Sequence, residues 1–305
     1  MPIGFLKGKG PSGFGYRSTA EQVTEGLNLA GKTYLVTGSN SGLGTEAVRV
    51  LGLRGARVLA TARSEDKALE ACKGFSGEII PIALDLSEPA SVRAAVAKVK
   101  DLGHSIDGII ANAGIMALPT RELKHGYEMQ FFTNHIGNFI LVTGLLDRLA
   151  ADGRVVALSS AAHKGTYSEG VRLDDLSAEK GYNNWQAYGQ SKLCNLLFAR
   201  HLAKRLPKGQ TAYSVHPGVI NTNLGRHMNR VFQGILNTVS PLVLKSIPQG
   251  AATEVYVATH PAAAAQGQGL YWADCNVETP SKHGQNDALA AALWDKSEEI
   301  VAGLP

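Results

Sequence analysis

The stretch Lys32–Arg63, KTYLVTGSNSGLGTEAVRVLGLRGARVLATAR, decides the fold. It opens with an apolar strand, is interrupted by Gly38, Gly42 and Gly44, continues as an amphipathic helix and ends on a second apolar strand. In such a unit the first glycine allows a tight turn, the second lets the backbone approach a pyrophosphate, and the third lets the helix pack on the sheet. The free N–H groups that begin the helix attract an anion. The turn therefore predicts a nucleotide site, and a glycine-rich turn without a ligand is the alternative.

The alternation of strands and helices continues along the chain. We expect further strands near residues 78–86, 107–114, 153–160, 211–218 and 269–274, and helices near 65–75, 88–103, 127–149 and from 188 onward. Ser18 or Thr19 is expected to cap a short helix, and Ser87 to open the helix after the third strand. Strands that alternate with helices form parallel sheets covered on both faces. The sequence therefore predicts an α/β fold: a Rossmann-like, doubly wound parallel sheet of about seven strands in one domain, 31–305, after an arm, 1–30.

The composition predicts a soluble protein without a nucleic-acid partner or an integral membrane segment. The 305 residues are 44% hydrophobic, with a net charge of +4 and dispersed charges, and the mean hydropathy is −0.05. No basic run suits a nucleic acid, and the uncharged stretches Met129–Leu146 and Val255–Ala273 contain too many polar residues to span a bilayer. Cys72, Cys194 and Cys275 are far apart and lack metal-site spacing, which predicts reduced thiols in a cytoplasmic protein.

The last residue of the second strand bears on the choice of cofactor. An acid at this position accepts hydrogen bonds from the adenosine ribose of NAD, whereas a basic residue pairs with the 2′-phosphate of NADP. Residues 61–63 contain no acid and end in Arg63, which predicts NADP. The alternative is an ordinary surface arginine. Asp85, at the end of the third strand, is expected to accept from the adenine amine or to cap the following helix.

Four polar side chains lie where strands and helices end. Tyr188 and Lys192 are one helical turn apart, and they follow Ser160 by 28 residues or more. A tyrosine can give a proton to a carbonyl oxygen, and an ammonium one turn away is expected to stabilise the tyrosinate and lower the tyrosine pKa. Ser160 is expected to polarise the same oxygen, and Asn134 to hold a water that returns the proton. This set predicts hydride-transfer chemistry at a carbonyl.

These motifs, in this order, resemble the short-chain dehydrogenase/reductase superfamily. They are TGSNSGLG at 37–44, DL at 85–86, NAG at 112–114, Asn134, Ser160, YxxxK at 188–192, and PG at 217–218 with Thr222 after it. The resemblance implies that Tyr188 is the general acid/base, Lys192 its partner, Ser160 the carbonyl binder and Asn134 the water holder. It implies a cofactor site made of Gly38, Ser41, Gly42, Leu43, Gly44, Arg63, Asp85, Leu86, Asn112, Ala113, Gly114, Tyr188, Lys192, Pro217, Gly218, Val219 and Thr222.

Within the superfamily the chain is most similar to the retinol-dehydrogenase-like branch. TNHIGNF, RVVALSSAAHKG, QAYGQSKLCNLLFARHLAKRL and HPGVINTNL carry that likeness, and GFGYRSTAEQVTEG and VLKSIPQGAAT resemble the plant members associated with the chloroplast inner-envelope import machinery. The branch is typically NADP(H)-linked. The arm shows neither the apolar anchor of membrane-bound retinol enzymes nor a Ser- and Arg-rich plastid presequence, so neither retinol nor an import role is carried over. Helices 127–149 and 188–206 are the usual dimer surfaces of the superfamily, which makes a homodimer one expected assembly.

Two segments predict a bulky apolar substrate. Ala161–Ala187 leaves the fifth strand beside Ser160, and a lid near 223–247 carries apolar residues at helical spacing. The alternatives are that both segments only cover the sheet or that the lid lies on a membrane surface. The leading hypothesis is an NADP(H)-dependent oxidoreductase that interconverts a small-molecule alcohol and carbonyl. A carbon–carbon double-bond reductase and an NADPH-sensing binding protein are the alternatives, and the lack of a G-x-S-x-G elbow disfavours a hydrolase.

Overall fold

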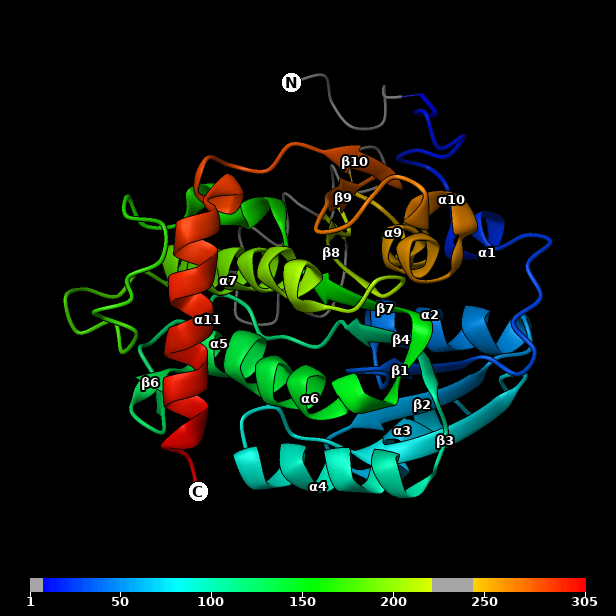
Figure 1. The fold of residues 1–305 in the computed structure, drawn as a ribbon, viewed down its shortest axis with the longest axis horizontal. Helices are drawn as coiled ribbons and strands as arrows, with labels where there is room; N and C mark the ends of the chain where they lie inside the picture. The colour runs from blue at the N-terminus through cyan, green and yellow to red at the C-terminus, as the bar shows by residue number, and fades with distance from the viewer. Residues whose placement is uncertain (1–7, 221–243) are drawn as a thin grey trace.

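The structure, a computed structural model, describes residues 8–220 and 244–305. These residues form an eight-stranded sheet with the order β10-β9-β8-β7-β4-β1-β2-β3 (Figure 1). All neighbouring strands in it are parallel except β9 and β10. The expected doubly wound α/β fold is therefore confirmed. Its strands are β1 (Thr33–Val36), β2 (Arg57–Ala62), β3 (Glu78–Ala83), β4 (Ile106–Ala111), β7 (Leu149–Leu158), β8 (Thr211–His216), β9 (Tyr271–Ala273) and β10 (Asn276–Glu278).

Both faces of the sheet are covered, because successive side chains of a strand point to opposite sides. In β1, Leu35 joins the core below α4, α6, α7 and α11, whereas Tyr34 and Val36 join the core below α2 and α9. The helices are α1 (Ala20–Val23), α2 (Gly42–Leu53), α3 (Glu65–Ala71), α4 (Pro89–Asp101), α5 (Met129–Phe131), α6 (Gly137–Leu145), α7 (Asn184–Arg205), α9 (Ile247–Thr259), α10 (Pro261–Ala264) and α11 (Asp287–Ala302). This arrangement leaves the carboxyl ends of the parallel strands at one edge, where such sheets bind ligands.

The described part of the arm is anchored to the domain. Thr19 caps α1, and Gln22 completes a capping box, which confirms the expected helix start. The helix packs against α9 and α2, and the guanidinium of Arg54 donates to the Glu21 carbonyl at 2.8 Å. The arm is therefore part of the folded surface beside α9.

One expected helix is wrong, and the sheet differs in one detail. The span 127–149 is not one helix, because Tyr127–Glu128 pairs as β6 with β5 (Leu123–Lys124). The Glu128 carboxylate accepts from Phe131 N at 2.8 Å and so starts the helix at α5. The sheet also has one strand more than expected, since the β9–β10 turn at Asp274 (φ 51°) lets β10 fold back antiparallel.

Gly137 lets the helix after Phe132–Ile136 lie directly on the loop that follows β3. A Cβ at Gly137 would lie 2.2 Å from the Leu86 carbonyl oxygen. Gly137→Ala is therefore expected to lower the free energy of unfolding by about 1–3 kcal/mol, the usual cost of overpacking. Thermal unfolding beside Gly165→Ala checks this, because a Cβ at Gly165 would meet nothing within 4 Å. Equal melting temperatures for the two variants would contradict the account.

Candidate active site

The glycine-rich turn between β1 and α2 closes against the end of β4. Gly38 has a φ of 71°, in the left-handed region that favours glycine. A Cβ at Gly44 would lie 2.3 Å from the Gly38 carbonyl oxygen and 2.7 Å from Asn112 Nδ2. Asn112 Nδ2 donates to the Thr37 carbonyl and Ala113 N to the Thr37 hydroxyl, each at 2.8 Å. The turn and the segment Asn112–Gly114, far apart in the sequence, therefore meet at one edge of the sheet.

The N terminus of α2 offers donors to an anion. Ser41 is its N-cap residue, makes no side-chain capping bond, and no acidic residue lies in the first turn. Its first N–H groups therefore have no intrahelical acceptor. Ser39 N donates to the Thr61 carbonyl (2.8 Å) and Thr61 N to the Ser39 hydroxyl (3.2 Å), which ties the end of β2 to the turn. Arg63 follows two residues later and is exposed. These residues fit a phosphorylated dinucleotide.

Asp85 shapes the turn after β3. Its Oδ1 accepts from Ser87 N (2.9 Å) and from the Ser87 hydroxyl (2.7 Å). The expected opening of the next helix by Ser87 is wrong, because Glu88 is the N-cap residue of α4. Leu86 is buried behind Asp85. The carboxyl of Asp85 thus lies at the same edge as Arg63 but already serves a local turn.

Helix α7 carries Tyr188 and Lys192 to the end of β7. A Cβ at Gly189 would lie 2.6 Å from the Ala162 carbonyl oxygen, so the helix packs directly on the segment that follows Ser160. The Ser160 hydroxyl accepts from Ala162 N at 3.2 Å, and the Ser160 side chain interacts with the Tyr188 phenol and lowers its pKa. The structure therefore brings the expected tyrosine and serine into contact.

Burial governs the proton affinity of Tyr188. It raises the pKa of the phenol to about 12, although the Ser160 side chain opposes the rise. Lys192 Nζ lies 5.7 Å from the centroid of the Tyr188 ring and donates to the Leu158 carbonyl at 3.0 Å. The net pKa of Tyr188 is therefore raised and not lowered as expected, since desolvation of the phenol dominates. At neutral pH Tyr188 keeps its proton.

Asn134 lies in a π-helical turn, a geometry that often marks functional sites. Its Nδ2 protons are both engaged, by the Ile115 carbonyl and by Ser191 Oγ, each at 2.9 Å, and its Oδ1 accepts from Ile115 N at 2.8 Å. A Cβ at Gly114 would lie 2.9 Å from Asn134 Oδ1 and 3.3 Å from Lys192 Nζ. The asparagine, the glycine and the lysine thus converge, and Asn134 Nδ2 has no proton left for a water.

Comparisons with known proteins agree with this geometry. The family model described as "short chain dehydrogenase" matches residues 32–172. The chain is 42% identical over 319 residues to "Short-chain dehydrogenase TIC 32 A, chloroplastic" of Brassica napus, with 99% of each covered. The chain belongs to the short-chain dehydrogenase/reductase family. It is also 37% identical over 296 residues to "Retinol dehydrogenase 14" of Homo sapiens, covering 90% of this chain and 87% of that protein, which confirms the expected branch.

The fold comparison agrees as well. A crystal structure of an uncharacterised protein from Mycobacterium paratuberculosis matches this short-chain dehydrogenase with a TM-score of 0.76 and 31% identity, covering 92% of this chain and 97% of that one. Within residues 8–220 and 244–305, no group of three or more His, Cys, Asp and Glu side chains can hold a metal ion. The helices in those ranges are all too short or too polar to cross a membrane.

One ionisable group near Lys192 of this short-chain dehydrogenase was not predicted from the sequence. Glu254 of α9 is fully buried, and neither carboxyl oxygen has a hydrogen-bond partner in the described part of the chain. Burial raises the pKa of Glu254 to about 8, against the charge of Lys192. Burial likewise lowers the pKa of Lys192 to about 8, against the charge of Glu254. The available signal was one acid within the otherwise uncharged run AATEVYVAT.

The remaining expected residues fall into two groups. Pro217, Gly218 and Val219 follow β8 at the same edge of the sheet. Thr222 and most of the expected lid near 223–247, up to residue 243, lie outside the described residues.

One aromatic residue of the segment Ala161–Ala187 is exposed beside the tyrosine. Trp185 is 46% exposed, and its ring centroid lies 6.4 Å from that of Tyr188. The hydroxyl of Tyr182 instead donates to the Leu118 carbonyl at 2.7 Å. Tyr182 therefore anchors this segment to the rest of the fold, whereas the ring of Trp185 is exposed next to Tyr188.

Glu254 makes stability depend on pH. Because its pKa is about 8 in the folded protein, against an ordinary value near 4.3 in the unfolded chain, the unfolded chain loses the proton first as pH rises. Stability is therefore lost between about pH 4.5 and 8. Glu254→Gln, which is neutral at every pH, should match the wild type near pH 4.5 and melt several degrees higher near pH 8, by roughly 1 kcal/mol or more.

Thermal unfolding from pH 4.5 to 8 checks this expectation. Glu46→Gln is the control, because its carboxylate is paired with Arg49 Nε at 2.8 Å and its neutralisation should lower the melting temperature instead. A difference between Glu254→Gln and wild type that stays constant over this range would rule out the linkage.

Proposed function

We propose that this short-chain dehydrogenase is an NADP(H)-dependent oxidoreductase that interconverts an alcohol and a carbonyl, working mainly as a reductase. The observation that carries the proposal is the meeting of Tyr188, Ser160 and Lys192 at the sheet edge that also holds the phosphate-binding turn. A phenol that keeps its proton at neutral pH suits the donation of a proton to a carbonyl. Family membership supports the oxidoreductase class.

The cofactor would lie along this edge. The α2 N terminus would bind its pyrophosphate, and Arg63 the 2′-phosphate. When bound, NADPH supplies the hydride to the carbonyl carbon. The residues assigned to the cofactor are Gly38, Ser41, Gly42, Leu43 and Gly44 for the phosphates, Arg63, Asp85 and Leu86 for the adenosine half, Asn112, Ala113 and Gly114 along its length, Tyr188 and Lys192 at the nicotinamide ribose, and Pro217, Gly218, Val219 and Thr222 at the nicotinamide end.

Protein groups would handle the proton. The Ser160 hydroxyl holds the substrate oxygen beside Tyr188, and the phenol of Tyr188 donates its proton to that oxygen as negative charge develops. Lys192 gives one of its three N–H bonds to the Leu158 carbonyl, so the others can face the tyrosinate that remains. The ammonium then stabilises the phenolate until a proton returns. Asn134 fixes the backbone next to Gly114 and so keeps these groups in register.

A bulky apolar carbonyl compound is the proposed substrate class. Two large apolar side chains are exposed at this edge of the sheet: Trp185, beside Tyr188, at 46%, and Val219, just after β8, at 60%. Trp185 lies one helical turn before Tyr188 and contacts its ring edge. Apolar surface placed beside a polar catalytic group favours substrates with a hydrocarbon body and one carbonyl.

The surroundings support two further points. All three cysteines, Cys72, Cys194 and Cys275, are buried free thiols, which supports a reducing compartment, and we propose the cytoplasm. In Figure 1, α11 (red) crosses α7, and Trp294 of α11 stacks on Phe198 of α7 with ring centroids 5.8 Å apart. Helix α7 is therefore covered by its own chain, which argues against its use in a homodimer.

Cofactor preference tests the assignment of Arg63. Arg63→Asp should reduce or reverse the preference for NADPH over NADH in kcat/KM, because a charge-assisted phosphate contact is worth about 1.5–3 kcal/mol, or roughly 10- to 150-fold. Lys73→Asp reverses an exposed charge just beyond α3 and should leave the ratio unchanged. Equal use of both cofactors by the wild-type protein would count against NADP.

Tyr188→Phe tests the proton donor. It keeps the ring and removes the phenol proton, so NADPH binding should persist while turnover falls by about 10²–10⁴-fold, the usual contribution of general acid catalysis. Tyr182→Phe removes a phenol that bonds the Leu118 carbonyl instead and should keep its turnover. Fluorescence titration and NADPH consumption with a bulky aldehyde measure the two quantities. A Tyr188→Phe variant as active as Tyr182→Phe would remove Tyr188 from the mechanism.

A further inference from the structure

Lys245 holds the loop that follows β8. We call residues 217–220 the β8 loop. Lys245 N donates to the Val219 carbonyl at 2.9 Å, and Lys245 forms a parallel bridge with Ile220. A Cβ at Gly218 would lie 2.6 Å from Lys245 Cδ and 2.9 Å from Cε, so the lysine side chain lies against the glycine. Backbone and side chain of one residue thus fix three successive positions of the loop.

The loop is also held from β8. Gly218 has a φ of 96°, a conformation that other residues adopt only with strain. Its N–H points at His216 Nδ1, 3.4 Å away. Burial and then the charge of Lys245 lower the pKa of His216 to about 4, so the imidazole stays a neutral acceptor at pH 7. Burial, with a smaller contribution from the charge of Lys245, therefore keeps the second support of the loop in its accepting form.

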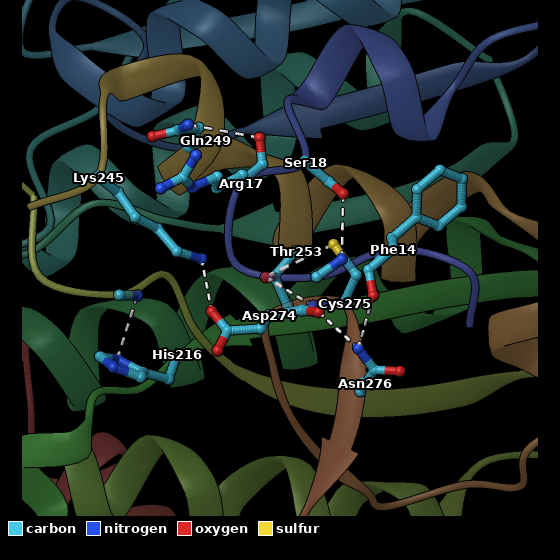
Figure 2. A network of polar contacts seen from close by, with 12 residues as sticks. Phe14, Arg17, Ser18, His216, Lys245, Gln249, Thr253, Asp274, Cys275 and Asn276 are labelled. Atoms are coloured by element: carbon cyan, nitrogen blue, oxygen red, sulfur yellow. Dashed lines mark hydrogen bonds and ion pairs between the residues drawn. The ribbon is translucent and has the colours of Figure 1, made fainter. Parts of the chain in front are cut away.

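The ammonium of Lys245 is buried in an ion pair. The lysine side chain is 1% exposed, and its Nζ lies 2.7 Å from Asp274 Oδ1 (Figure 2). The ring of Tyr16, from the arm, lies on the ammonium with its centroid 5.0 Å from Nζ. A pair buried this deeply gains little net stability over apolar residues, but removing one partner leaves a costly unpaired charge. The ion pair therefore contributes mainly by holding Lys245 and Asp274 in one arrangement.

Asp274 is itself held from three directions. It sits at the β9–β10 turn with a φ of 51°. The following N–H, of Cys275, donates to Thr253 Oγ1 of α9 at 3.2 Å. Asn276 Nδ2 donates to the Asp274 carbonyl (2.7 Å) and to the Phe14 carbonyl of the arm (3.1 Å), as Figure 2 shows. The arm, α9 and the turn therefore meet around the backbone of residues 274–276, from which the Asp274 carboxylate reaches Lys245.

We propose that Lys245 and Asp274 are positioning residues: through their buried ion pair, the arm and the β9–β10 turn set the conformation of the β8 loop and thereby the binding of the nicotinamide half of the cofactor. The position of the nicotinamide in this inference rests on the proposed function, whereas the ion pair and the loop contacts are observed in the structure. Fixing a reacting group before it is needed lowers the entropy cost of reaching the reactive geometry. The adenosine half, bound at the far side of the sheet edge near Arg63, should not depend on the pair.

Three variants separate this role from general stability. Lys245→Met keeps an unbranched chain and removes the charge, Asp274→Asn keeps the shape and removes the charge, and the double variant removes both charges of the pair. Arg154→Met is the matched control, because it also removes a cation that is not fully exposed. Arg154 is in β7, and its Nη1 donates to the Val257 and His260 carbonyls at 3.1 and 2.9 Å, at the end of α9 remote from Lys245.

The first readout needs no cofactor. Hydrogen exchange of the amides of residues 218–220 should become at least about tenfold faster in the three variants, and stay near wild type in Arg154→Met, because only the former lose the local restraint. Unchanged exchange at 218–220, with a loss of melting temperature like that of Arg154→Met, would show that the pair is only structural and would overturn the proposal. If the single variants do not fold, the double variant decides between these results.

The second readout uses two ligands. Adenosine 2′,5′-bisphosphate, which lacks the nicotinamide, should bind all variants within about twofold of wild type, whereas the NADPH dissociation constant should rise roughly 5- to 30-fold in the three pair variants, a loss of about 1–2 kcal/mol. An equal loss for both ligands would overturn the proposal. Failure of the wild type to bind either ligand, with the exchange result intact, would instead refute the proposed function and leave the loop restraint standing.

Discussion

The buried ammonium of Lys192 is the constraint on which the active site depends. A cation without water must be surrounded by oxygen atoms or opposite charge. Lys192 meets that need through the Leu158 carbonyl at the end of β7, which accepts from its Nζ at 3.0 Å. Gly114 lies beside the ammonium, and a larger residue would crowd it, because a Cβ at position 114 would lie 3.3 Å from Lys192 Nζ. Helix α7, the end of β7 and the segment after β4 are therefore held in one arrangement by a single group.

The same edge is fixed at both ends by contacts between distant parts of the chain. At one end, Asn112 closes the phosphate-binding turn through the Thr37 carbonyl. At the other, Lys245 and Asp274 hold the β8 loop from the side of the arm. A dinucleotide spans such an edge with its two halves in different places, so its affinity and its reactive geometry can be set separately. Under the proposed function, this division is the route by which an arm far from the phenol would affect the reaction.

Much of the fold and of the candidate site could be predicted from the sequence, because local patterns encode them. Hydrophobic periodicity marks the buried strands, glycine marks the turn, and the four-residue spacing places Tyr188 and Lys192 on one helix face. The rest depends on contacts that no local pattern encodes. Helix start at Met129 depends on a cap from Glu128, and the high pKa of Tyr188 depends on how completely α7 is covered. Lys245 and Asp274 are 29 residues apart and pair only because β9 and the β8 loop lie side by side.

The central claim is that Tyr188 and its neighbours complete a hydride transfer to a carbonyl carbon. Incubating the protein with NADPH deuterated at both C4 positions and a bulky aldehyde, followed by mass spectrometry of the product, tests it most directly. The account predicts an alcohol with one deuterium on the carbinol carbon. A second incubation uses an α,β-unsaturated aldehyde. Deuterium on the former alkene carbon would contradict the account, and so would NADPH that binds without passing deuterium to any carbonyl.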